Sequence, residues 1–324
     1  MHTLSTQPLI SIVLPVFNEA AGIQTTIATL EHFVSVQPER FELIFVDDGS
    51  TDDSLAQLQA ARQHNPNLKI VQFARNFGHQ LAISAGLREA HGDAVIVMDA
   101  DLQDPPSVIP SMIAKWQAGA AVVYGQRRHR SGETWFKKAS AAAFYRLLKA
   151  MTNTDIPVDT GDFRLMDRRV VNVLKSMNES DPYVRGMVAW VGFDQTSVLY
   201  DRQDRTAGES KYPLRQMIRL AMNGLTSFST VPLALANWLA GSFGLTAALI
   251  LLGNGLAGTV TTLTWLLVSL FIIGAGITAT IGIMGSYLGR VFTASRRRPA
   301  YVIQATYGFE HPVARPATRQ MMQG

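Results

Sequence analysis

A long stretch without charge is the feature that most constrains this chain. No Asp, Glu, Lys or Arg lies between Arg219 and Arg290, although charged residues make up 17% of the sequence. Two apolar runs, residues 228–253 and 263–289, fill most of this stretch. Each is long enough to cross a hydrocarbon layer of about 30 Å as a helix, and neither has a polar face. We therefore expect a transmembrane hairpin across residues 227–290.

The residues around the two runs predict their orientation. Basic residues lie on both sides of the hairpin: Lys211, Arg215, Arg219, Arg290, Arg296, Arg297 and Arg298. Positive flanks remain in the cytoplasm, so both flanks belong there and the number of crossings is even. The first residues lack the pattern of a secretory signal, so we expect both termini and the N-terminal domain in the cytoplasm. A pair of buried helices in a soluble core is the alternative.

Two further segments accompany the hairpin. Residues 211–226 mix apolar side chains with Lys and Arg, which predicts an interfacial amphipathic helix. Residues 291–324 are expected to be a basic cytosolic tail that frays after Pro299. Small residues within the runs could pack against a second copy in a homo-oligomer. These residues are Gly241, Gly244, Gly274 and Gly276.

Charge and cysteine content exclude several kinds of function. The chain contains no cysteine, so disulfides, thiol catalysis and Cys-ligated metals are excluded. The formal net charge is only +4. This mild excess suits an anionic membrane surface or phosphate ligands at least as well as nucleic acid. We expect a membrane protein without a nucleic-acid partner.

Residues 1–210 predict an α/β domain. Apolar, β-branched runs alternate with helical patterns. The expected strands are 9–16, 41–46, 69–73, 94–98 and 120–124, and the expected helices are 19–36, 52–64, 79–90 and 105–117. Asn18 is the expected N-cap of the first helix, and Ser50 with Thr51 would begin the second. The alternation favours a Rossmann-like, mostly parallel sheet with helices on both faces.

Four polar clusters follow the first four expected strands. They are Pro15-Val-Phe-Asn-Glu19, Asp47-Asp-Gly-Ser-Thr-Asp52, Arg75-Asn-Phe-Gly78 and Asp99-Ala-Asp-Leu-Gln103. Each cluster alone could be ordinary turn chemistry. Open α/β sheets, however, bind ligands beyond the carboxyl ends of their strands. Four clusters at four such ends therefore predict one common site.

Asp99 and Asp101 indicate a divalent cation. In an extended segment, residues i and i+2 point the same way, so the two carboxylates would repel each other without a cation between them. Oxygen ligands favour Mg²⁺ or Mn²⁺, and Mg²⁺ is commonly held by one or two carboxylates plus substrate phosphates. The sequence contains no GxxxxGK[ST], and no GxGxxG follows any of the expected strands, which argues against an ATPase or an NAD enzyme.

Taken together, these motifs resemble those of the family 2 glycosyltransferases, which have the GT-A fold. Further matches are similar to the polyprenyl-phosphate branch, which includes dolichyl-phosphate mannose synthase and bacterial undecaprenyl-phosphate glucosyltransferases. They are Tyr124-Gly-Gln-Arg127, Thr160-Gly-Asp-Phe-Arg164, Gly208-Glu-Ser-Lys-Tyr212 and the hairpin itself. The resemblance implies inverting transfer of a sugar, from a UDP-linked hexose in preference to GDP-mannose, onto polyprenyl phosphate. It also implies a bacterial inner membrane.

The resemblance carries site roles onto matching residues. Nucleotide-sugar binding would involve Pro15, Val16, Phe17, Glu19, Asp48, Arg75, Asp99, Gln103, Arg205 and Ser210. Asp99 and Asp101 would hold the metal. Arg127, with Lys137 or Lys138, would meet the lipid phosphate, and Lys211 would lie on a loop that closes over both substrates.

Asp162 matches an acidic residue that is often proposed as the catalytic base in this family. A monoalkyl phosphate has a second pKa near 6, so at pH 7 the acceptor is already largely a dianion and needs little deprotonation. Orientation of Arg164 or of the acceptor is therefore a competing role for Asp162.

Three other functions stay open from the sequence. A processive polysaccharide synthase would carry Gln-X-X-Arg-Trp, but here Leu220 follows Gln216-Met-Ile-Arg219. A non-catalytic nucleotide-sugar binder would be expected to lose a metal carboxylate, and both are present. A glycosyltransferase with a protein acceptor would not need the hairpin.

Overall fold

The structure is a computed structural model. It describes residues 7–128, 160–177, 179, 182–202, 242–243, 245, 249, 262–296 and 298–309. Two compact units divide the chain. The first contains Met1–Ser140, Thr154–Lys211 and Pro299–Gly324, and the second contains Ala141–Asn153 and Tyr212–Arg298. Each unit is described by itself.

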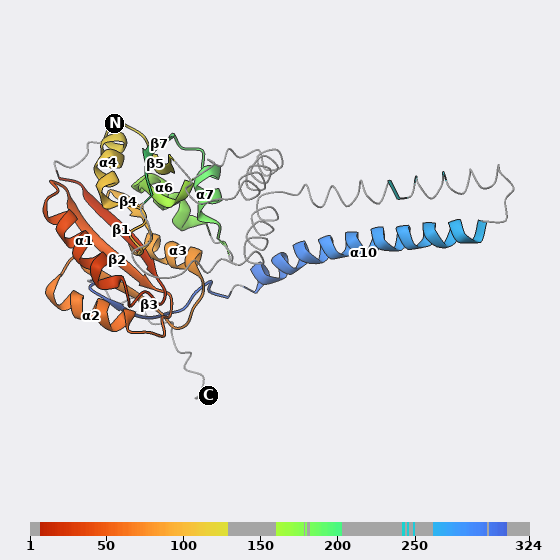
Figure 1. The fold of residues 1–324 in the computed structure, drawn as a ribbon, viewed down its shortest axis with the longest axis horizontal. Helices are drawn as coiled ribbons and strands as arrows, with labels where there is room; N and C mark the ends of the chain where they lie inside the picture. The colour runs from red at the N-terminus through yellow and green to blue at the C-terminus, as the bar shows by residue number, and fades with distance from the viewer. Residues whose placement is uncertain are drawn as a thin grey trace, which may run out of the picture. The chain divides into compact units, whose positions relative to one another are not determined.

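The first unit alternates strands and helices over most of its length (Figure 1). Its strands are β1 (Leu9–Val16), β2 (Arg40–Asp47), β3 (Leu68–Phe73), β4 (Ala94–Val97), β5 (Val122–Arg127), β6 (Thr160–Asp167), β7 (Gln195–Tyr200) and β8 (Ile303–Tyr307). Its helices are α1 (Ile23–Ser35), α2 (Ser54–His64), α3 (His79–Glu89), the 3₁₀ turn η1 (Pro106–Val108), α4 (Ile109–Gln117), α6 (Arg168–Ser176) and α7 (Val184–Trp190). The five predicted strands and four predicted helices all form.

One sheet carries the whole unit, in the order β7-β5-β6-β4-β1-β2-β3-β8. β1 pairs in parallel with β2 and β4, β2 with β3, and β5 with β7. β6 lies between β4 and β5 and runs antiparallel to both, and β8 runs antiparallel to β3. The sheet is therefore mixed, and the prediction of a mostly parallel sheet missed β6. Its charged Asp162 and Arg164 hide the strand pattern, although both side chains are buried.

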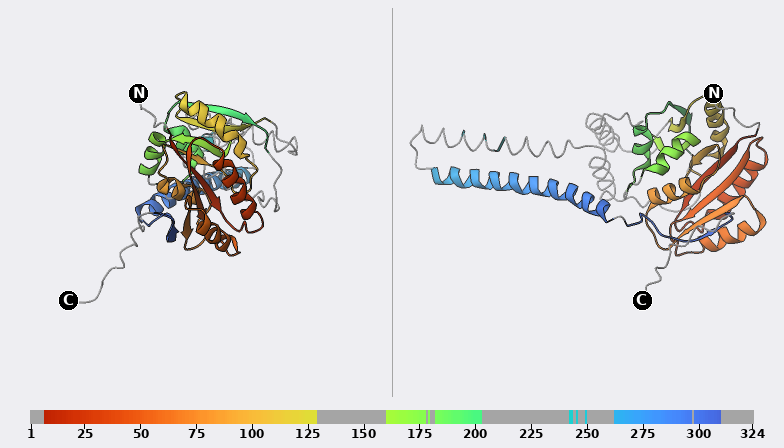
Figure 2. Two further views of the ribbon diagram at one scale, coloured as in Figure 1. Left: turned by 90° about the vertical axis from the view of Figure 1, so that its left-hand side faces the viewer. Right: turned by 180° about the vertical axis from the view of Figure 1, so that it is seen from behind.

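Helices cover both faces of the sheet, as Figure 2 shows from two sides. On one face, α1, α2 and α4 cover a cluster that includes Ile12, Leu14 and Phe45. On the other face, α3 lies against β1 and β2. A Cβ on Gly86 of α3 would collide with Val13, so glycine allows this helix to lie directly on the sheet. The packed helices thus hold the parallel strands in place, and the site forms at the carboxyl ends of these strands.

Three local expectations need correction. Gly22, not Asn18, is the N-cap of α1, and Asp53, not Ser50 or Thr51, precedes α2. Both loops are longer than predicted because their polar side chains bind each other. The expected frayed tail is wrong for β8, because the outer edge of β3 offers hydrogen bonds that this segment takes up.

The second unit contains α10 (Thr262–Ser295), which includes the second predicted apolar run. Residues Val268–Gly289 have a mean hydropathy of 1.9. By length and composition, α10 is the one helix among the described residues that could cross a membrane. Phe243 lies against Gly276 of α10, with its Cγ 3.2 Å from the position that a Cβ would take. Most of the first run and the interfacial segment 211–226 lie outside the described residues, so the hairpin stays a prediction.

Candidate active site

Side chains of the β2–α2 loop hold the β1–α1 loop at the carboxyl edge of the sheet. The Asn18 backbone N–H donates to Ser50 Oγ at 3.0 Å, and Asn18 Oδ1 accepts from the Thr51 backbone N–H at 2.8 Å. Asn18 adopts a φ of 55°. Two of the predicted polar clusters are therefore one interlocked structure.

Gly49 brings a third cluster into contact with the second. Its φ is +67°, and a Cβ there would lie 2.6 Å from the backbone nitrogen of Asn76. Only glycine combines this conformation with so close an approach. The loop after β2 thus packs backbone to backbone against the loop after β3.

Asp48 fastens the same two loops. Its carboxylate accepts from the backbone N–H groups of Phe77 at 2.7 Å and Gly78 at 2.9 Å. Burial raises the pKa of Asp48, although these two N–H donors favour the carboxylate. The resemblance implied that Asp48 takes part in nucleotide-sugar binding. The structure shows in addition that Asp48 holds the loop that leads into α3.

The first cluster offers less side-chain surface than the sequence suggested. Pro15 and Val16 are buried, and Val16 belongs to the hydrophobic core. Phe17 is 44% exposed and Glu19 is partly exposed. Arg75 is exposed, and its guanidinium lies 3.9 Å from the centre of the Phe77 ring. A ligand at this edge can therefore reach Phe17, Glu19 and Arg75 more directly than Val16.

Asp99 and Asp101 follow β4 in a turn. β4 ends at Val97, and Leu102 has a φ of 56°. The assumption that residues 99–101 continue the extended strand was wrong, because the chain turns here toward η1. Asp101 Oδ1 accepts from the Gln103 backbone N–H at 3.1 Å. All three predicted side chains lie on this one turn.

Asp99 has the electrostatics of a cation ligand. Its Oδ1 atom is buried without a hydrogen-bond partner. Burial raises the pKa of Asp99 to about 6, His79 opposes the shift, and the carboxylates of Asp162, Asp104 and Asp101 add to it. The ionised form of Asp99 is therefore destabilised unless positive charge lies nearby.

The protein groups around Asp99 do not complete a metal site by themselves. Among the described residues, no group of three His, Cys, Asp or Glu side chains is arranged to hold a metal ion. This agrees with cations that take one or two carboxylates and complete their shell with water and substrate phosphates. The Asp99 oxygen that accepts no hydrogen bond and the neighbouring Asp101 fit such a cation.

Asp162 lies at the centre of a polar network that the sequence did not predict. Its carboxylate accepts from Arg185 Nε at 2.7 Å and Nη2 at 3.1 Å, and from Gln80 Nε2 at 3.2 Å. His79 Nε2 lies 3.1 Å from the same carboxylate and 3.6 Å from Asp99 Oδ1. Burial alone would raise the pKa of Asp162, but Arg185 and His79 hold it well below its usual range.

His79 joins the turn after β4 to β6. It begins α3, directly after the loop that Asp48 holds. Burial disfavours the charged imidazole, but the hydrogen bond to Asp162 and the Asp99 carboxylate together raise the pKa of His79. His79 therefore stands between the expected metal ligand and the expected base.

Arg164 lies beside this network on β6. Its Nη2 donates to the Gly161 carbonyl at 2.9 Å, and its Nε is buried without a partner. Burial lowers the pKa of Arg164 to about 10, Asp162 opposes the shift, and Arg185 adds to it. Arg164 and Arg185 thus supply buried positive charge around Asp162.

A second network surrounds Arg127 at the end of β5. The Arg127 Nε donates to the Tyr200 hydroxyl at 3.5 Å, and the Tyr200 hydroxyl donates to Asp104. A Cβ on Gly161 would lie 3.1 Å from Arg127 Nη2. Arg202 Nε lies 3.9 Å from Asp104. Arg127 is therefore held close to Gly161 of β6, the residue that precedes Asp162.

Several predicted residues lie outside the described residues: Lys137, Lys138, Arg205, Ser210 and Lys211. Conversely, sequence reasoning missed His79, Gln80, Asp104, Arg185 and Tyr200. His79 and Asp104 each follow a predicted motif by one residue, so slightly longer motifs would have included them. Arg185 and Tyr200 carried no such signal.

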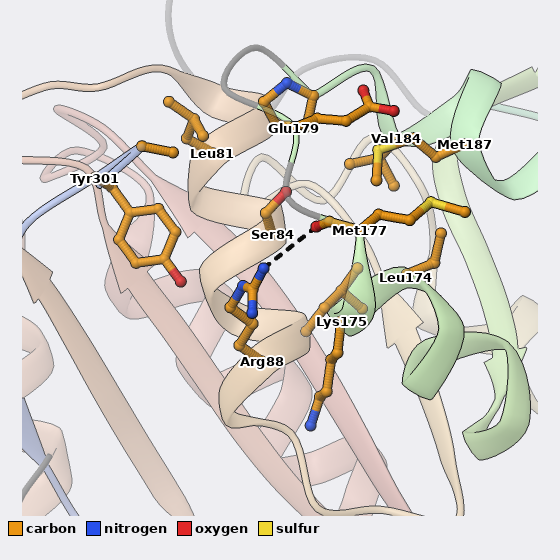
Figure 3. A pocket seen from close by; sticks show the side chains of 13 residues that line it. Leu81, Ser84, Arg88, Leu174, Lys175, Met177, Glu179, Val184, Met187 and Tyr301 are labelled. Atoms are coloured by element: carbon orange, nitrogen blue, oxygen red, sulfur yellow. Dashed lines mark hydrogen bonds between the residues drawn. The ribbon is translucent and has the colours of Figure 1, made fainter. Parts of the chain in front are cut away.

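A small cavity lies away from this site. Figure 3 shows it beside α3, between Tyr301 on one side and Met177 and Lys175 on the other. Its volume is about 40 Å³, whereas sites for small ligands usually span hundreds of Å³. It is too small for a sugar nucleotide.

Comparisons with known proteins identify the family of this chain. Residues 11–174 match the family described as Glycosyl transferase family 2. The uncharacterized glycosyltransferase YkcC of Bacillus subtilis (strain 168) is 47% identical over 93% of this chain and 95% of its own length. The bactoprenol glucosyl transferase of Shigella phage SfV is 38% identical over 91% of this chain and 98% of its own length.

A solved structure shows the same fold. Glucosyl-3-phosphoglycerate synthase from Mycobacterium tuberculosis, in complex with Mn²⁺, UDP and glucosyl-3-phosphoglycerate, matches with a TM-score of 0.51. It is 22% identical, and the match covers 68% of this chain and 80% of that one. The family match, the relatives and the shared fold agree. The chain belongs to glycosyl transferase family 2 and is a glycosyltransferase with a GT-A catalytic domain.

Proposed function

We propose that this enzyme transfers a hexose, with glucose the first candidate, from its UDP derivative to a polyprenyl phosphate such as undecaprenyl phosphate. The observation that carries the proposal is similarity over 91–92% of the chain to relatives named bactoprenol glucosyl transferase. Fewer residues lie outside these matches than α10 contains, so the matches include at least part of this apolar helix. The similarity to these relatives therefore extends into the part of the chain that is suited to a membrane.

The reaction forms one bond and breaks one. An oxygen of the acceptor phosphate attacks the anomeric carbon of the sugar and forms a new C–O bond. The C–O bond between that carbon and the nucleoside diphosphate breaks, and UDP leaves with the bonding electron pair. Attack from the face opposite the leaving group inverts the anomeric configuration.

Asp99 and Asp101 would hold a divalent cation together with the donor phosphates. The buried Asp99 oxygen, which accepts no hydrogen bond, and the raised pKa of Asp99 support this assignment. The mycobacterial relative was solved with Mn²⁺ and UDP, and Mg²⁺ or Mn²⁺ suits these oxygen ligands equally well. When bound, the cation would stabilise the negative charge of the departing diphosphate.

The chain's own residues would hold the acceptor phosphate. Arg127 faces β6, and Arg164 and Arg185 flank Asp162. We assign either Lys137 or Lys138 to the same phosphate, Lys211 to a loop that closes over both substrates, and Arg205 and Ser210 to the donor, as the resemblance suggested. Arginine is well suited to this task because its planar fork matches phosphate oxygens.

Asp162 would orient these groups. Because Arg185 and His79 keep its pKa far below neutral, Asp162 is a poor proton acceptor at pH 7. The acceptor dianion needs no strong base. Asp162 would therefore fix Arg185 and His79 in place, on the acceptor side of Asp99.

The membrane arrangement has its own test. If residues 228–253 and 263–289 both cross the bilayer, the turn between them faces away from the cytoplasm. Because the chain has no cysteine, single substitutions report location directly. Thr259→Cys should react with an impermeant maleimide on intact cells, and Ser5→Cys should react only after lysis. Reaction of both, or of neither, before lysis would refute two crossings.

Product formation is the test of the proposed reaction. Detergent-purified enzyme would be given Mn²⁺, with or without undecaprenyl phosphate, and a panel of donors: UDP-glucose, UDP-galactose, UDP-N-acetylglucosamine and GDP-mannose. We expect nucleoside diphosphate release that needs the lipid and is strongest with UDP-glucose. Lipid-dependent release from GDP-mannose alone would refute the UDP assignment. Nucleotide binding without release from any donor would favour a non-catalytic binder.

A further inference from the structure

The segment after α10 lies against residues 74–79, here called the active-site loop. None of the roles proposed above involves this segment. Residues 299–309, here called the strap, follow the end of α10 after only three residues. The strap contains β8, which pairs antiparallel with β3 from Ile70↔Tyr307 to Phe73↔Ile303. The Ala74 N–H donates to the Val302 carbonyl at 3.0 Å. The strap therefore follows β3 up to the first residue of the active-site loop.

Tyr301 extends this contact beyond the last strand pair. Its ring stacks on Phe73, with the ring centres 4.9 Å apart and the planes 16° from parallel. Phe73 in turn meets Phe77 edge to face, with the centres 5.6 Å apart. Such aromatic pairs contribute beyond the apolar area that they bury. A continuous row of rings thus runs from the strap to the loop.

The loop at the end of this row carries site residues. The backbone N–H groups of Phe77 and Gly78 bind Asp48, and the next residue is His79, which lies between Asp99 and Asp162. On its other side, the Tyr301 ring faces α3, the helix that His79 begins, and forms a wall of the small cavity in Figure 3. Tyr301 therefore stacks on the row of rings and also lines a cavity beside α3.

We propose that Tyr301 is a positioning residue. Its ring packs on Phe73, supports Phe77 through Phe73, and so fixes residues 74–79 of the catalytic site. The inference rests on the proposed glycosyl transfer for its kinetic consequence. Its structural part, local order in residues 74–79, does not depend on the acceptor or on the sugar.

Two variants on the same strap separate positioning from simple strand pairing. Tyr301→Ala removes the stacked ring beside the active-site loop. Tyr307→Ala removes a ring of the same size at the far end of β8, where the hydroxyl binds Gln72 at 3.2 Å. Tyr301→Phe keeps the stacked ring and should restore the wild-type behaviour.

Hydrogen exchange and kinetics together give the test. In Tyr301→Ala we expect the Phe77 and Gly78 amides to exchange at least tenfold faster. We also expect UDP–Mn²⁺ affinity or kcat/KM to fall about tenfold or more, since small misplacements are costly in active sites. For Tyr301→Phe and Tyr307→Ala, the exchange rates of the Phe77 and Gly78 amides should stay within about twofold of wild type. The UDP–Mn²⁺ affinity and kcat/KM of these variants should also stay within about twofold.

Three outcomes would overturn the inference. The first is that the Phe77 and Gly78 amides of Tyr301→Ala exchange at the wild-type rate. Equal effects of Tyr301→Ala and Tyr307→Ala would assign the strap a purely structural role, as would faster exchange throughout the domain. If wild-type enzyme transferred no sugar but Tyr301→Ala still loosened this loop and weakened UDP binding, the proposed reaction would fail while the positioning role stood.

Discussion

Replacement of Asp162 by asparagine tests whether this residue orients its neighbours or removes a proton. The side chain is 6% exposed and accepts two hydrogen bonds from Arg185, one from Gln80 and one from His79. In Asp162→Asn, one oxygen remains and the new NH₂ group faces donors. Arg185 then loses its ion pair and at least one of its two bonds.

The structure sets the size of the effect. Removing one partner of a buried ion pair costs about 3–5 kcal/mol. The Arg185 side chain is 27% exposed, so water compensates in part and we expect a loss of about 2–4 kcal/mol. For a domain of this size, the loss corresponds to a melting temperature lower by roughly 5–15 °C. Thermal unfolding of detergent-purified enzyme measures it.

A double-mutant cycle then separates the two roles. If Asp162 acts by holding Arg185, Asp162→Asn and Arg185→Gln remove the same interaction. The double variant should then have a kcat/KM within about threefold of the worse single variant. If Asp162 is a base that acts independently of Arg185, the two losses should multiply, and our reasoning would be wrong. We also expect Asp101→Asn to lower kcat more than Asp162→Asn does, and the reverse order would contradict the ranking.

Three further predictions follow from the described residues. Because the pKa of Asp99 is raised to about 6, protons compete with the cation below that pH. Mn²⁺ affinity should fall about tenfold per pH unit below 6 and level off above it, and calorimetry that shows no such dependence would exclude Asp99 as a ligand. Gly49→Ala should cost about 2 kcal/mol or more because of its φ and its contact with Asn76, whereas Gly22→Ala, with open space around it, should melt within about 2 °C of wild type. Tyr200→Phe removes the hydroxyl that donates to buried Asp104 and should cost about 1–3 kcal/mol; an unchanged melting temperature would show that this bond contributes nothing.

The sequence predicted the first half of the fold well because the physical signal there is local. The strands that became β1 to β4 are short apolar runs between turn residues, and their observed bounds differ from the predicted ones by one residue at most. Their order along the chain brings Asp48 and Asp99 to one edge of the sheet. This convergence can be predicted from the order of the strands alone, without knowledge of side-chain contacts.

The remainder depends on tertiary contacts. β6 carries Asp162 and Arg164, which look like loop residues until Arg185 and the Gly161 carbonyl pair with them. β8 has a weak strand pattern and forms because β3 offers an open edge. His79 acquires its place only when α3 is set against the turn after β4. Burial and partners of this kind cannot be seen in residue spacing.

The central claim is that a polyprenyl phosphate receives the sugar at the site built around Asp99. Radiolabelled UDP-glucose, undecaprenyl phosphate and Mn²⁺ would be incubated with wild-type enzyme and with Asp99→Asn, and the label in the extracted lipid would be measured. We predict label in an acid-labile lipid phosphate with wild type, and a loss of at least a hundredfold with Asp99→Asn. UDP release without labelled lipid, or equal labelling by both enzymes, would contradict the account.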